Sequence, residues 1–418
     1  MRSGREADAS IGGAVPAVNG AGSGPAADPI HGPGAILTGA RGIGPARPGQ
    51  GRPRIALLLP NLTGGGAEAV NLTLIREFIA RGHKVDLVLA RATGALLDRI
   101  PPEVRLVDLS TPRLVRALPA IRRYLRRERP DAMLVGLWPL TVIAVAAKLL
   151  SGVRTRIVVC DHNILSMSPD AQGWLRRTLM TTALAFFYRR ADARVAVSAA
   201  AARDLARLAL LPKERFAIIH NPIPPPADAG PSARPAGFWP DAAGPRILTV
   251  GNLKAPKNHA LLLRAFARLA EQRPAVLAIL GEGPLRRALE QMVRELGVAD
   301  RVSLPGFCDD PAPAYRSADL FVLSSSSEGF GNVLVEALAA GLPVVSTDCP
   351  GGPAEILDGG RYGDLVPCDD PDALADGMAR ALDAPRDTAR LRARARDFVP
   401  SAAADSYLRL LLGSDSVR

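Results

Sequence analysis

The sequence predicts an α/β protein made of two doubly wound domains, each with a parallel sheet covered by helices on both faces. Short β-rich apolar runs alternate with amphipathic stretches, which is typical of such sheets. The alternation occurs twice, on either side of a segment rich in proline and glycine. With 418 residues, the chain is long enough for two cores. Two such domains present the carboxyl ends of their strands to a central cleft, where we expect the ligand.

The elements follow this plan in order. Residues 1–51 contain 13 Gly and 6 Pro and no aromatic Phe, Trp or Tyr, so we expect a disordered Gly/Pro/Ala-rich tail. A first domain spans residues 52–222, a Pro/Gly-rich linker 223–245 and a second domain 246–399; residues 400–418 are expected to pack back on the first domain. Expected strands of the first domain are 55–59, 85–89, 132–135, 157–160, 195–197 and 218–219. Those of the second are 247–250, 275–280, 302–304, 320–323 and 344–346.

Composition excludes several classes of protein. The four cysteines form no CxxC or CxxxC pair, so neither a zinc site nor a disulfide scaffold is expected. The N-terminus has no continuous apolar run of signal-peptide length, and the most apolar stretch, 132–147, is broken by Pro139 and ends at Lys148. We therefore expect an unexported, cytoplasmic protein without a transmembrane helix.

The positive charge is concentrated in the first domain. The net charge of the whole chain is +11, and residues 52–222 alone hold 27 Lys and Arg against 13 Asp and Glu. This favours an anionic partner for that half, and a membrane surface rather than nucleic acid, because the arginines are not interleaved with aromatic residues. Two basic amphipathic segments, around 113–129 and 174–190, are candidates for lying on anionic lipid; a solvated helix face is the equal alternative.

The densest chemical signal lies in residues 324–345. An apolar strand is followed by Glu328-Gly-Phe-Gly-Asn332, and a helix is expected to begin near Gly331 or Asn332. Free amides at a helix start favour a phosphate, and the helix dipole adds to this. Glu328 before the helix and Glu336 in its second turn suit the hydroxyl groups of a sugar and a ribose. Taken singly, Glu328 is better explained as an N-terminal capping carboxylate and Glu336 as a solvated helix residue; the whole constellation favours the site.

This segment resembles the Glu-x7-Glu signature of retaining nucleotide-sugar glycosyltransferases of family 4, which have the two-domain GT-B architecture. The resemblance continues through Val250-Gly-Asn-Leu-Lys254-Ala-Pro-Lys257, Gly281-Glu-Gly283, Leu304-Pro-Gly-Phe307 and the block from Ser346 to Glu355. It implies a UDP-sugar donor and a hydroxyl acceptor, with no metal required. The acidic run 369–372 is accordingly interpreted as the cap of a helix at 373–382.

Roles are carried over from the resemblance residue by residue. Glu328, His162 and Lys257 match catalytic positions: Glu328 contacts the donor hexose, His162 the donor sugar or the acceptor, and Lys257 the diphosphate. Glu336 matches the glutamate that binds ribose. The other donor-binding positions are Asn252, Gly281, Gly283, Phe307, Phe330, Gly331 and Asn332. Gly64, Gly65 and Gly66, which follow the first strand, match the loop along the donor phosphates and the acceptor entrance; a tight turn is the alternative.

The chain departs from the family at Asn252, where an arginine is usual. This removes one charge partner of the diphosphate, for which Lys254 and Arg286 are candidate substitutes. His220 follows the last strand of the first domain, which makes the cleft an alternative position for it, although a structural role is favoured. His83 and His259 are expected to be structural.

The function we expect is transfer of a hexose or N-acetylhexosamine to a hydroxyl of a polyprenyl-linked glycan in cell-surface polysaccharide synthesis. The enzyme would be attached peripherally to the inner face of the cytoplasmic membrane. A nucleotide-sugar epimerase or phosphorylase of similar fold and a non-catalytic sugar-nucleotide-binding protein are the alternatives.

Overall fold

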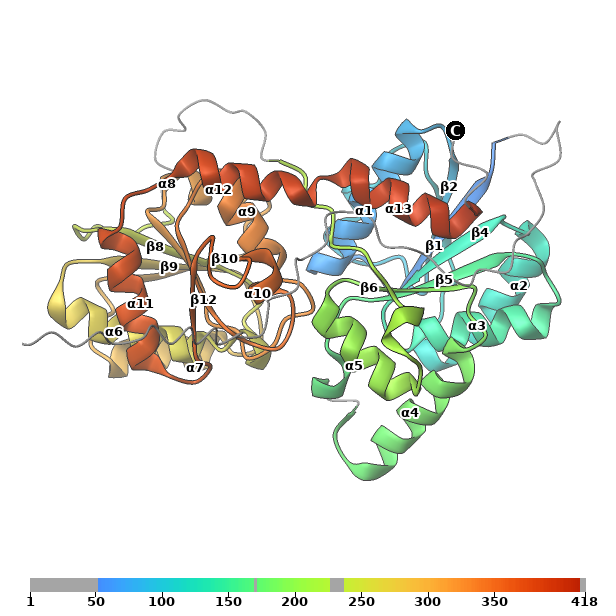
Figure 1. Cartoon of the computed structure of the whole chain (residues 1–418), viewed down its shortest axis with the longest axis horizontal. Helices are drawn as coiled ribbons and strands as arrows, with labels where there is room; N and C mark the ends of the chain where they lie inside the picture. Colours follow the sequence, from blue (N-terminus) through green and yellow to red (C-terminus); the bar gives the residue numbers. More distant parts are fainter. Residues whose placement is uncertain (1–51, 169–170, 226–236, 414–418) are drawn as a thin grey trace, which may run out of the picture. The chain divides into compact units, whose positions relative to one another are not determined.

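The computed structural model describes residues 52–168, 171–225 and 237–413, all of which lie within one compact unit of the chain. The expected tail at 1–51, residues 226–236 of the linker and the last residues of the chain, 414–418, lie outside the described residues. Two parallel sheets with covering helices are present, which confirms the predicted α/β class (Figure 1).

The first sheet has seven strands in the order β3-β2-β1-β4-β5-β6-β7, and every neighbouring pair is parallel. Its interior strand β1 is buried from Ile55 to Leu59, as a strand covered on both faces should be. The strands are Arg54–Leu59 (β1), Lys84–Leu89 (β2), Arg105–Asp108 (β3), Ala132–Gly136 (β4), Arg156–Asp161 (β5), Ala193–Ala196 (β6) and Ala217–Ile218 (β7).

The second sheet has six parallel strands in the order β10-β9-β8-β11-β12-β13. In both sheets the strand order reverses beside the first strand of the domain, and loops at such a reversal form ligand sites in doubly wound folds. The strands are Arg246–Val250 (β8), Val276–Leu280 (β9), Val302–Gly306 (β10), Leu320–Leu323 (β11), Val344–Thr347 (β12) and Asp364–Val366 (β13).

Two strands were not predicted from the sequence: β3 and β13. Each lies at an edge of its sheet and neither is a continuous apolar run, since β3 reads Arg-Leu-Val-Asp and β13 Asp-Leu-Val. An edge strand is only partly covered, so its sequence carries little of the apolar signal that identifies a central strand.

The helices cover both sheets, and the longest are α1 and α4. Their bounds are Gly66–Ala80 (α1), Leu118–Glu128 (α2), Leu140–Ser151 (α3), Trp174–Tyr188 (α4), Ala199–Ala209 (α5), His259–Gln272 (α6), Arg286–Glu295 (α7), Ala312–Ser317 (α8), Asn332–Ala340 (α9), Pro353–Ile356 (α10), Pro371–Asp383 (α11), Thr388–Ala395 (α12) and Pro400–Leu412 (α13). Short 3-10 turns are found at Leu97–Arg99, Leu114–Arg116, Leu165–Met167, Lys213–Arg215, Ala255–Lys257 and Arg396–Phe398.

Three helix starts can be compared with the sequence. Helix α9 begins at Asn332 after Gly331, whose backbone is left-handed with a φ of 104°, as expected for that segment. Helix α11 is capped by the Asp370 carboxylate, which accepts from two backbone amides, so the capping interpretation of the acidic run is confirmed. The basic segment expected as one helix over 113–129 is instead a 3-10 turn followed by α2, with Pro119 in the first turn of α2.

The C-terminal helix α13 packs on the first sheet, although it follows the second domain in sequence. It lies beside α1 and against β4 and β5 (Figure 1). The Arg81 guanidinium lies 2.9 Å from the Asp405 carboxylate, and Arg156 Nε donates to the carbonyl of Leu410 at 2.5 Å. Residues far apart in sequence therefore share one hydrophobic core with β5.

Candidate active site

The centre of the candidate site is a direct contact between Lys257 and Glu328. Lys257 Nζ lies 2.6 Å from Glu328 Oε1, and Ser325 Oγ donates to the same oxygen at 2.6 Å. Lys257 ends the 3-10 turn after β8, and Glu328 lies in the loop after the neighbouring strand β11. The parallel pairing of β8 and β11 thus brings together two of the three residues expected to be catalytic.

The loop after β11 is fixed to the Lys257 turn by hydrogen bonds. Ser324 Oγ donates to the carbonyl of Lys257 at 3.0 Å, and the Ser326 amide donates to the carbonyl of Pro256 at 2.8 Å. Glu328 is held from the other side, because its amide donates to the carbonyl of Pro350 at 3.0 Å. A carboxylate held in this way, with only 9% of the residue exposed, is preorganised to accept hydrogen bonds.

At Gly329 this loop lies close to the backbone of the first domain. A Cβ atom at Gly329 would lie 1.7 Å from the carbonyl oxygen of His162, so only glycine fits there. Ser198 Oγ donates to the Gly329 carbonyl at 2.8 Å. The backbone of His162, the third residue expected to be catalytic, is therefore next to the loop that carries Glu328.

Asn332 joins the start of α9 to the glycine loop of the first domain. Its Nδ2 donates to the Gly66 carbonyl at 3.3 Å, and its Oδ1 accepts from Asn221 Nδ2 at 2.8 Å. Phe307, which is 49% exposed, lies over Gly64, with its Cε2 3.9 Å from the position of a Cβ there. Gly64, Gly66, Phe307 and Asn332 are thus near one another, as a shared site requires.

Phe330 is buried and stacks on His220, with ring centroids 5.2 Å apart. His220 Nε2 also lies 3.2 Å from Glu355 Oε2, whose other oxygen accepts from the Ala200 amide. His220 therefore contacts the 328–332 loop through Phe330. Nothing in the sequence indicated that Glu355 would be the partner of His220.

Glu336 has its own partner away from Lys257. Tyr315 Oη donates to Glu336 Oε2 at 2.8 Å, which leaves Oε1 without a hydrogen bond among the described residues. Burial raises the pKa of Glu336 above its ordinary value, and the hydrogen bond from Tyr315 opposes the rise. Tyr315 was missed by sequence reasoning, because nothing in a single sequence marks a contact between α8 and α9.

The remaining predicted donor residues lie around the turn after β8. Gly281 and Gly283 abut the backbone of Gly251 and Leu253, close enough that a Cβ would collide with a carbonyl oxygen at either position. Asn252 in the same turn is exposed, and its side chain makes no hydrogen bond within the described ranges. The two glycines thus have a packing role that explains them independently of a ligand.

The two candidate substitutes for the missing arginine differ in their surroundings. Arg286 is engaged, with its guanidinium 2.7 Å from Glu282, 3.0 Å from Glu290 and 2.6 Å from the Leu304 carbonyl. Lys254 is exposed, and its charge acts on Glu68 of the first domain. Burial raises the pKa of Glu68, and Lys254 lowers it in part. Lys254 is therefore the cation with fewer competing contacts.

His162 is only 8% exposed, and burial lowers its pKa to about 4. It is therefore a neutral imidazole near neutral pH. The preceding Asp161 accepts hydrogen bonds from the Trp138 amide at 2.8 Å and from the Tyr188 hydroxyl, and burial raises its pKa to about 6. Both side chains are buried at the end of β5, and the hydrogen bonds of Asp161 to Trp138 and Tyr188 fix the start of the loop after that strand.

Within the described ranges, no group of three or more His, Cys, Asp or Glu residues is arranged to hold a metal ion. No helix there is long and apolar enough to cross a bilayer. These findings concern the described ranges alone.

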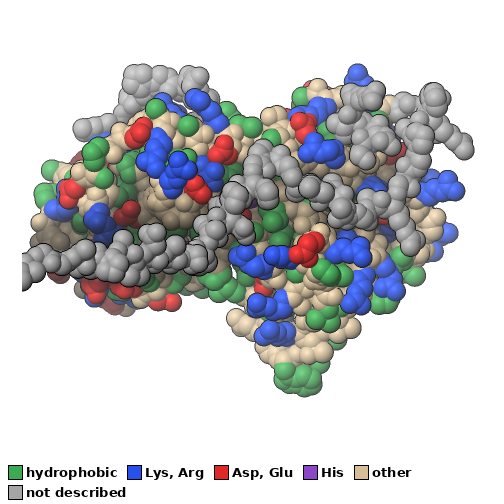
Figure 2. All heavy atoms as spheres, in the orientation of Figure 1, with side chains coloured by type: hydrophobic (Ala, Val, Ile, Leu, Met, Phe, Trp, Pro, Cys, Tyr) green, Lys and Arg blue, Asp and Glu red, His purple; other side chains and the backbone are tan. Residues whose placement is uncertain are grey.

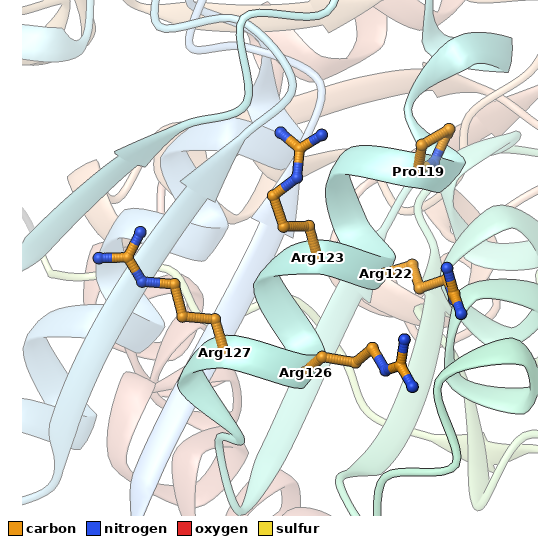
Figure 3. Close-up of a pocket in the computed structure, with 5 residues that line it drawn as sticks. All are labelled: Pro119, Arg122, Arg123, Arg126 and Arg127. Carbon is orange, nitrogen blue, oxygen red and sulfur yellow. The ribbon is translucent and has the colours of Figure 1, made fainter.

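The basic residues of the first domain gather on outward-facing helices. Arg122, Arg123, Arg126 and Arg127 of α2 line a shallow hollow with Pro119, and Arg123 and Arg126 have no ion pair among the described residues (Figure 3). The start of α4 exposes Trp174 (80%) and Leu179 (62%) beside basic residues. Figure 2 shows hydrophobic side chains at the lower end of the first domain, the region where Figure 1 draws α4, with Lys and Arg side chains above them.

Two family profiles match the chain in succession. The profile described as "Glycosyltransferase Family 4" matches residues 64–225, and the one described as "Glycosyl transferases group 1" matches residues 244–384. The chain belongs to glycosyltransferase family 4. The expectation drawn from the Glu328…Glu336 segment is thereby confirmed at the level of the family.

Curated relatives of this family 4 chain include two enzymes of Campylobacter jejuni. One, N-acetylgalactosamine-N,N'-diacetylbacillosaminyl-diphospho-undecaprenol 4-alpha-N-acetylgalactosaminyltransferase, is 38% identical over 40% of this chain and 46% of its own length. The other, GalNAc-alpha-(1->4)-GalNAc-alpha-(1->3)-diNAcBac-PP-undecaprenol alpha-1,4-N-acetyl-D-galactosaminyltransferase, is 25% identical over 86% of this chain and 98% of its own length. The chain spans half or less of the length of several curated relatives that it matches, including the first of these two enzymes.

Solved structures share the fold. A glycosyltransferase from Rickettsia africae has a TM-score of 0.70 at 16% identity, over 87% of this chain and all of that chain. Anabaena HepE in complex with UDP has a TM-score of 0.67 at 22% identity, over 86% and 99%. These likenesses support the two-domain GT-B architecture predicted from the sequence.

Proposed function

We propose that this chain is a retaining glycosyltransferase that moves a hexose or N-acetylhexosamine from a UDP-sugar to a hydroxyl of a lipid-linked glycan in cell-surface polysaccharide synthesis. The observation that carries the proposal is the Lys257–Glu328 contact of 2.6 Å at the start of the loop leading to α9. It puts a cation for phosphate and an acceptor for sugar hydroxyls side by side. The relatives named for transfer to undecaprenol-linked glycans and the UDP complex of HepE support the choice of substrates.

The residues divide the work by chemistry. Lys257 leaves Glu328 to pair with the diphosphate, which frees Glu328 Oε1 for a hydroxyl of the donor hexose. Glu336 accepts from the ribose through Oε1, while Tyr315 holds its other oxygen. The backbone of Phe330, Gly331 and Asn332 provides amides to the phosphates at the start of α9. The turns at Asn252, Gly281, Gly283 and Phe307 and the Gly64–Gly65–Gly66 loop enclose the donor, and His162 faces the transferred sugar or the acceptor.

The transfer step balances without an enzyme nucleophile. The bond between the anomeric carbon and the β-phosphate oxygen breaks, and the acceptor oxygen bonds to that carbon on the same face. The acceptor proton passes to the departing phosphate oxygen, and UDP is released. Lys257 stabilises the growing charge on the diphosphate, so that no metal ion is required for this task.

The two sheets separate donor from acceptor in this proposal. Residues 52–222 form the acceptor-binding domain, 223–245 the linker and 246–399 the nucleotide-sugar-binding domain. The segment 400–418 belongs with the first domain, which the packing of α13 on α1, β4 and β5 supports.

Ligand-induced thermal stabilisation tests the donor site. We expect UDP and one UDP-sugar to raise the melting temperature of the purified protein equally with and without EDTA, because a ligand that binds the native state stabilises it. Lys257→Ala and Glu328→Gln should reduce the shift, whereas Asp383→Asn, at an exposed ion pair of the same domain, should not. Absence of a shift with every nucleotide in folded protein contradicts the proposal, and UDP-sugar hydrolysis or epimerisation without an acceptor favours the epimerase alternative.

We further propose that the first domain binds the surface of an anionic membrane through α2 and α4. The exposed side chains of Trp174 and Leu179 can enter the headgroup region, and the α2 arginines attract acidic headgroups at about 1 kcal/mol each. This attachment would bring a lipid-linked acceptor to the site from the cytoplasmic face.

Vesicle flotation tests the attachment. The protein should float with vesicles that contain phosphatidylglycerol and remain unbound with pure phosphatidylcholine. Trp174→Ser and Arg123→Glu should each weaken flotation, while Arg287→Glu, an exposed arginine of the second domain, should have little effect. Equal flotation of wild type and both first-domain variants refutes this surface.

A further inference from the structure

A buried chain of polar side chains connects the C-terminal helix to His162. Tyr407 of α13 is 1% exposed, and its Oη lies 3.3 Å from Cys160 Sγ at the end of β5. Cys160 Sγ in turn lies 3.7 Å from His162 Nε2. The three side chains come from positions 160, 162 and 407, so the fold rather than the local sequence brings them together.

The protons along this chain can be placed. Either the Tyr407 hydroxyl or the Cys160 thiol can donate in this contact, and the hydroxyl has no other partner among the described residues. When the hydroxyl donates to the sulfur, the proton of the thiol is left for a second contact. Burial raises the pKa of the Cys160 thiol to about 12 and lowers that of His162 to about 4, so both groups are neutral near neutral pH. The thiol therefore keeps a proton that it can donate to Nε2.

The opposite side of the imidazole faces an acceptor. Asn221 Nδ2 donates to Asn332 Oδ1 at 2.8 Å, which orients the amide and leaves Asn221 Oδ1 as the free end. Oδ1 of Asn221 and Nδ1 of His162 are both buried, and neither has a partner at hydrogen-bonding distance among the described residues. The Asn221 side chain nevertheless raises the pKa of His162, against the larger effect of burial, as an acceptor does.

We propose that Tyr407 is a positioning residue which, through the Cys160 thiol, holds His162 in the tautomer that is protonated on Nδ1. Nε2 is then occupied as an acceptor, and the buried Nδ1–H faces the free Oδ1 of Asn221, whose amide group also binds Asn332 at the start of α9. The C-terminal helix thus determines the hydrogen-bonding character of a residue at the candidate site. The assignment of the tautomer rests on the contacts among Tyr407, Cys160 and His162 and on the neutral state of the thiol and the imidazole, whereas its part in catalysis rests on the proposed function.

Nitrogen-15 NMR of the protein labelled at histidine tests the tautomer directly. The chain has five histidines, and the His162 signals are assigned by their loss in His162→Asn. In the wild type we expect a protonated Nδ1 and an unprotonated Nε2 for His162. In Cys160→Ala the donor to Nε2 is lost, so the two tautomers should mix; Cys160→Ser, which keeps a donor, should restore the wild-type pattern in part.

Tyr407→Phe separates the two links of the chain. It leaves the thiol in place but frees the sulfur of its fixed donor, so we expect the His162 signals to move towards mixed tautomers by less than in Cys160→Ala. Arg409→Ala, on the exposed side of the same helix, is the matched control and should leave the signals unchanged. A wild-type His162 protonated on Nε2, or signals that do not move in Cys160→Ala, overturns the proposal.

Kinetics then distinguish this inference from the proposed function. With a UDP-sugar donor and an acceptor found by thermal stabilisation, Tyr407→Phe should lower kcat several-fold at nearly constant KM for the donor. If the tautomer shifts as expected while kcat is unchanged, the chain of contacts stands and the catalytic role of His162 fails. If the tautomer does not shift, the positioning role fails whatever the activity.

Discussion

Removing Lys257 should expose how strongly the candidate site depends on its central ion pair. The side chain of Glu328 is only 9% exposed. In Lys257→Ala, Ser325 Oγ is the remaining side-chain partner of its carboxylate. Breaking a fully buried ion pair costs about 3–5 kcal/mol, and an exposed pair contributes about 0.2–1 kcal/mol. Because 27% of the Lys257 side chain is exposed, we expect a loss of about 2–3 kcal/mol in the free energy of unfolding.

Glu328→Gln should cost less, about 1 kcal/mol, because the amide is neutral and the partly exposed Lys257 can turn to water. The double variant Lys257→Ala/Glu328→Gln should then be more stable than the sum of the single effects, with a coupling of about 2 kcal/mol. Urea unfolding of the four proteins, followed by a signal from the second domain, gives this coupling.

The control is the Arg273–Asp383 pair, at 2.8 Å in the same domain but with side chains 30% and 66% exposed. Its coupling should be about 0.5 kcal/mol or less. If the Lys257–Glu328 coupling is no larger than that of the control, the two charges are screened by water. The idea of a preorganised pair that a donor must separate would then be refuted.

Two further outcomes follow from close contacts and burial. Gly329→Ala would bring a Cβ to 1.7 Å from the His162 carbonyl oxygen, so we expect a loss of about 1–3 kcal/mol in stability and a loss of UDP-sugar turnover; wild-type activity would contradict the close approach. The buried Asp161 binds its proton more tightly in the folded state, with a pKa raised to about 6, than in the unfolded chain. Stability measured relative to Asp161→Asn should therefore fall as the pH rises from about 4 to about 6, by about 3 kcal/mol in total, and stay constant above; a flat difference across that range would refute the shift.

The sequence predicted strands well where a segment is buried on both faces. It predicted side-chain contacts poorly where the two residues come from distant segments. Central strands such as β1 and β9 were predicted because they are continuous apolar runs, whereas β3 has charged ends and an exposed edge. Glu328 and Lys257 were both chosen from the resemblance, yet their contact joins positions 71 residues apart. The periodicity and the motif spacing of a single sequence do not show that two residues so far apart are in contact.

Several residues missed at the site are partners of side chains that lie there. Tyr315 holds Glu336, Asn221 holds Asn332, and Tyr407 lies 247 positions from Cys160 in the sequence. Each is a polar side chain in an otherwise apolar or loop segment, which from the sequence alone is indistinguishable from an ordinary buried tyrosine or a turn asparagine. A cluster of this kind becomes visible only once the sheet order fixes which loops are neighbours.

The contacts that hold the 328–332 loop against the first domain depend largely on main-chain oxygens. Ser198 Oγ donates to the Gly329 carbonyl, and Asn332 Nδ2 donates to the Gly66 carbonyl. Every residue type has a main-chain carbonyl, so the residue that supplies the carbonyl can have almost any side chain. The side chain is restricted only where it would collide with a neighbour, as a Cβ atom would at Gly329. The same loop carries Glu328, which contacts Lys257 on the side of the second sheet. A ligand that drew Lys257 away from Glu328 would act on the segment that also holds the first-domain loops, so under the proposed function donor binding would be linked to the contacts around His162.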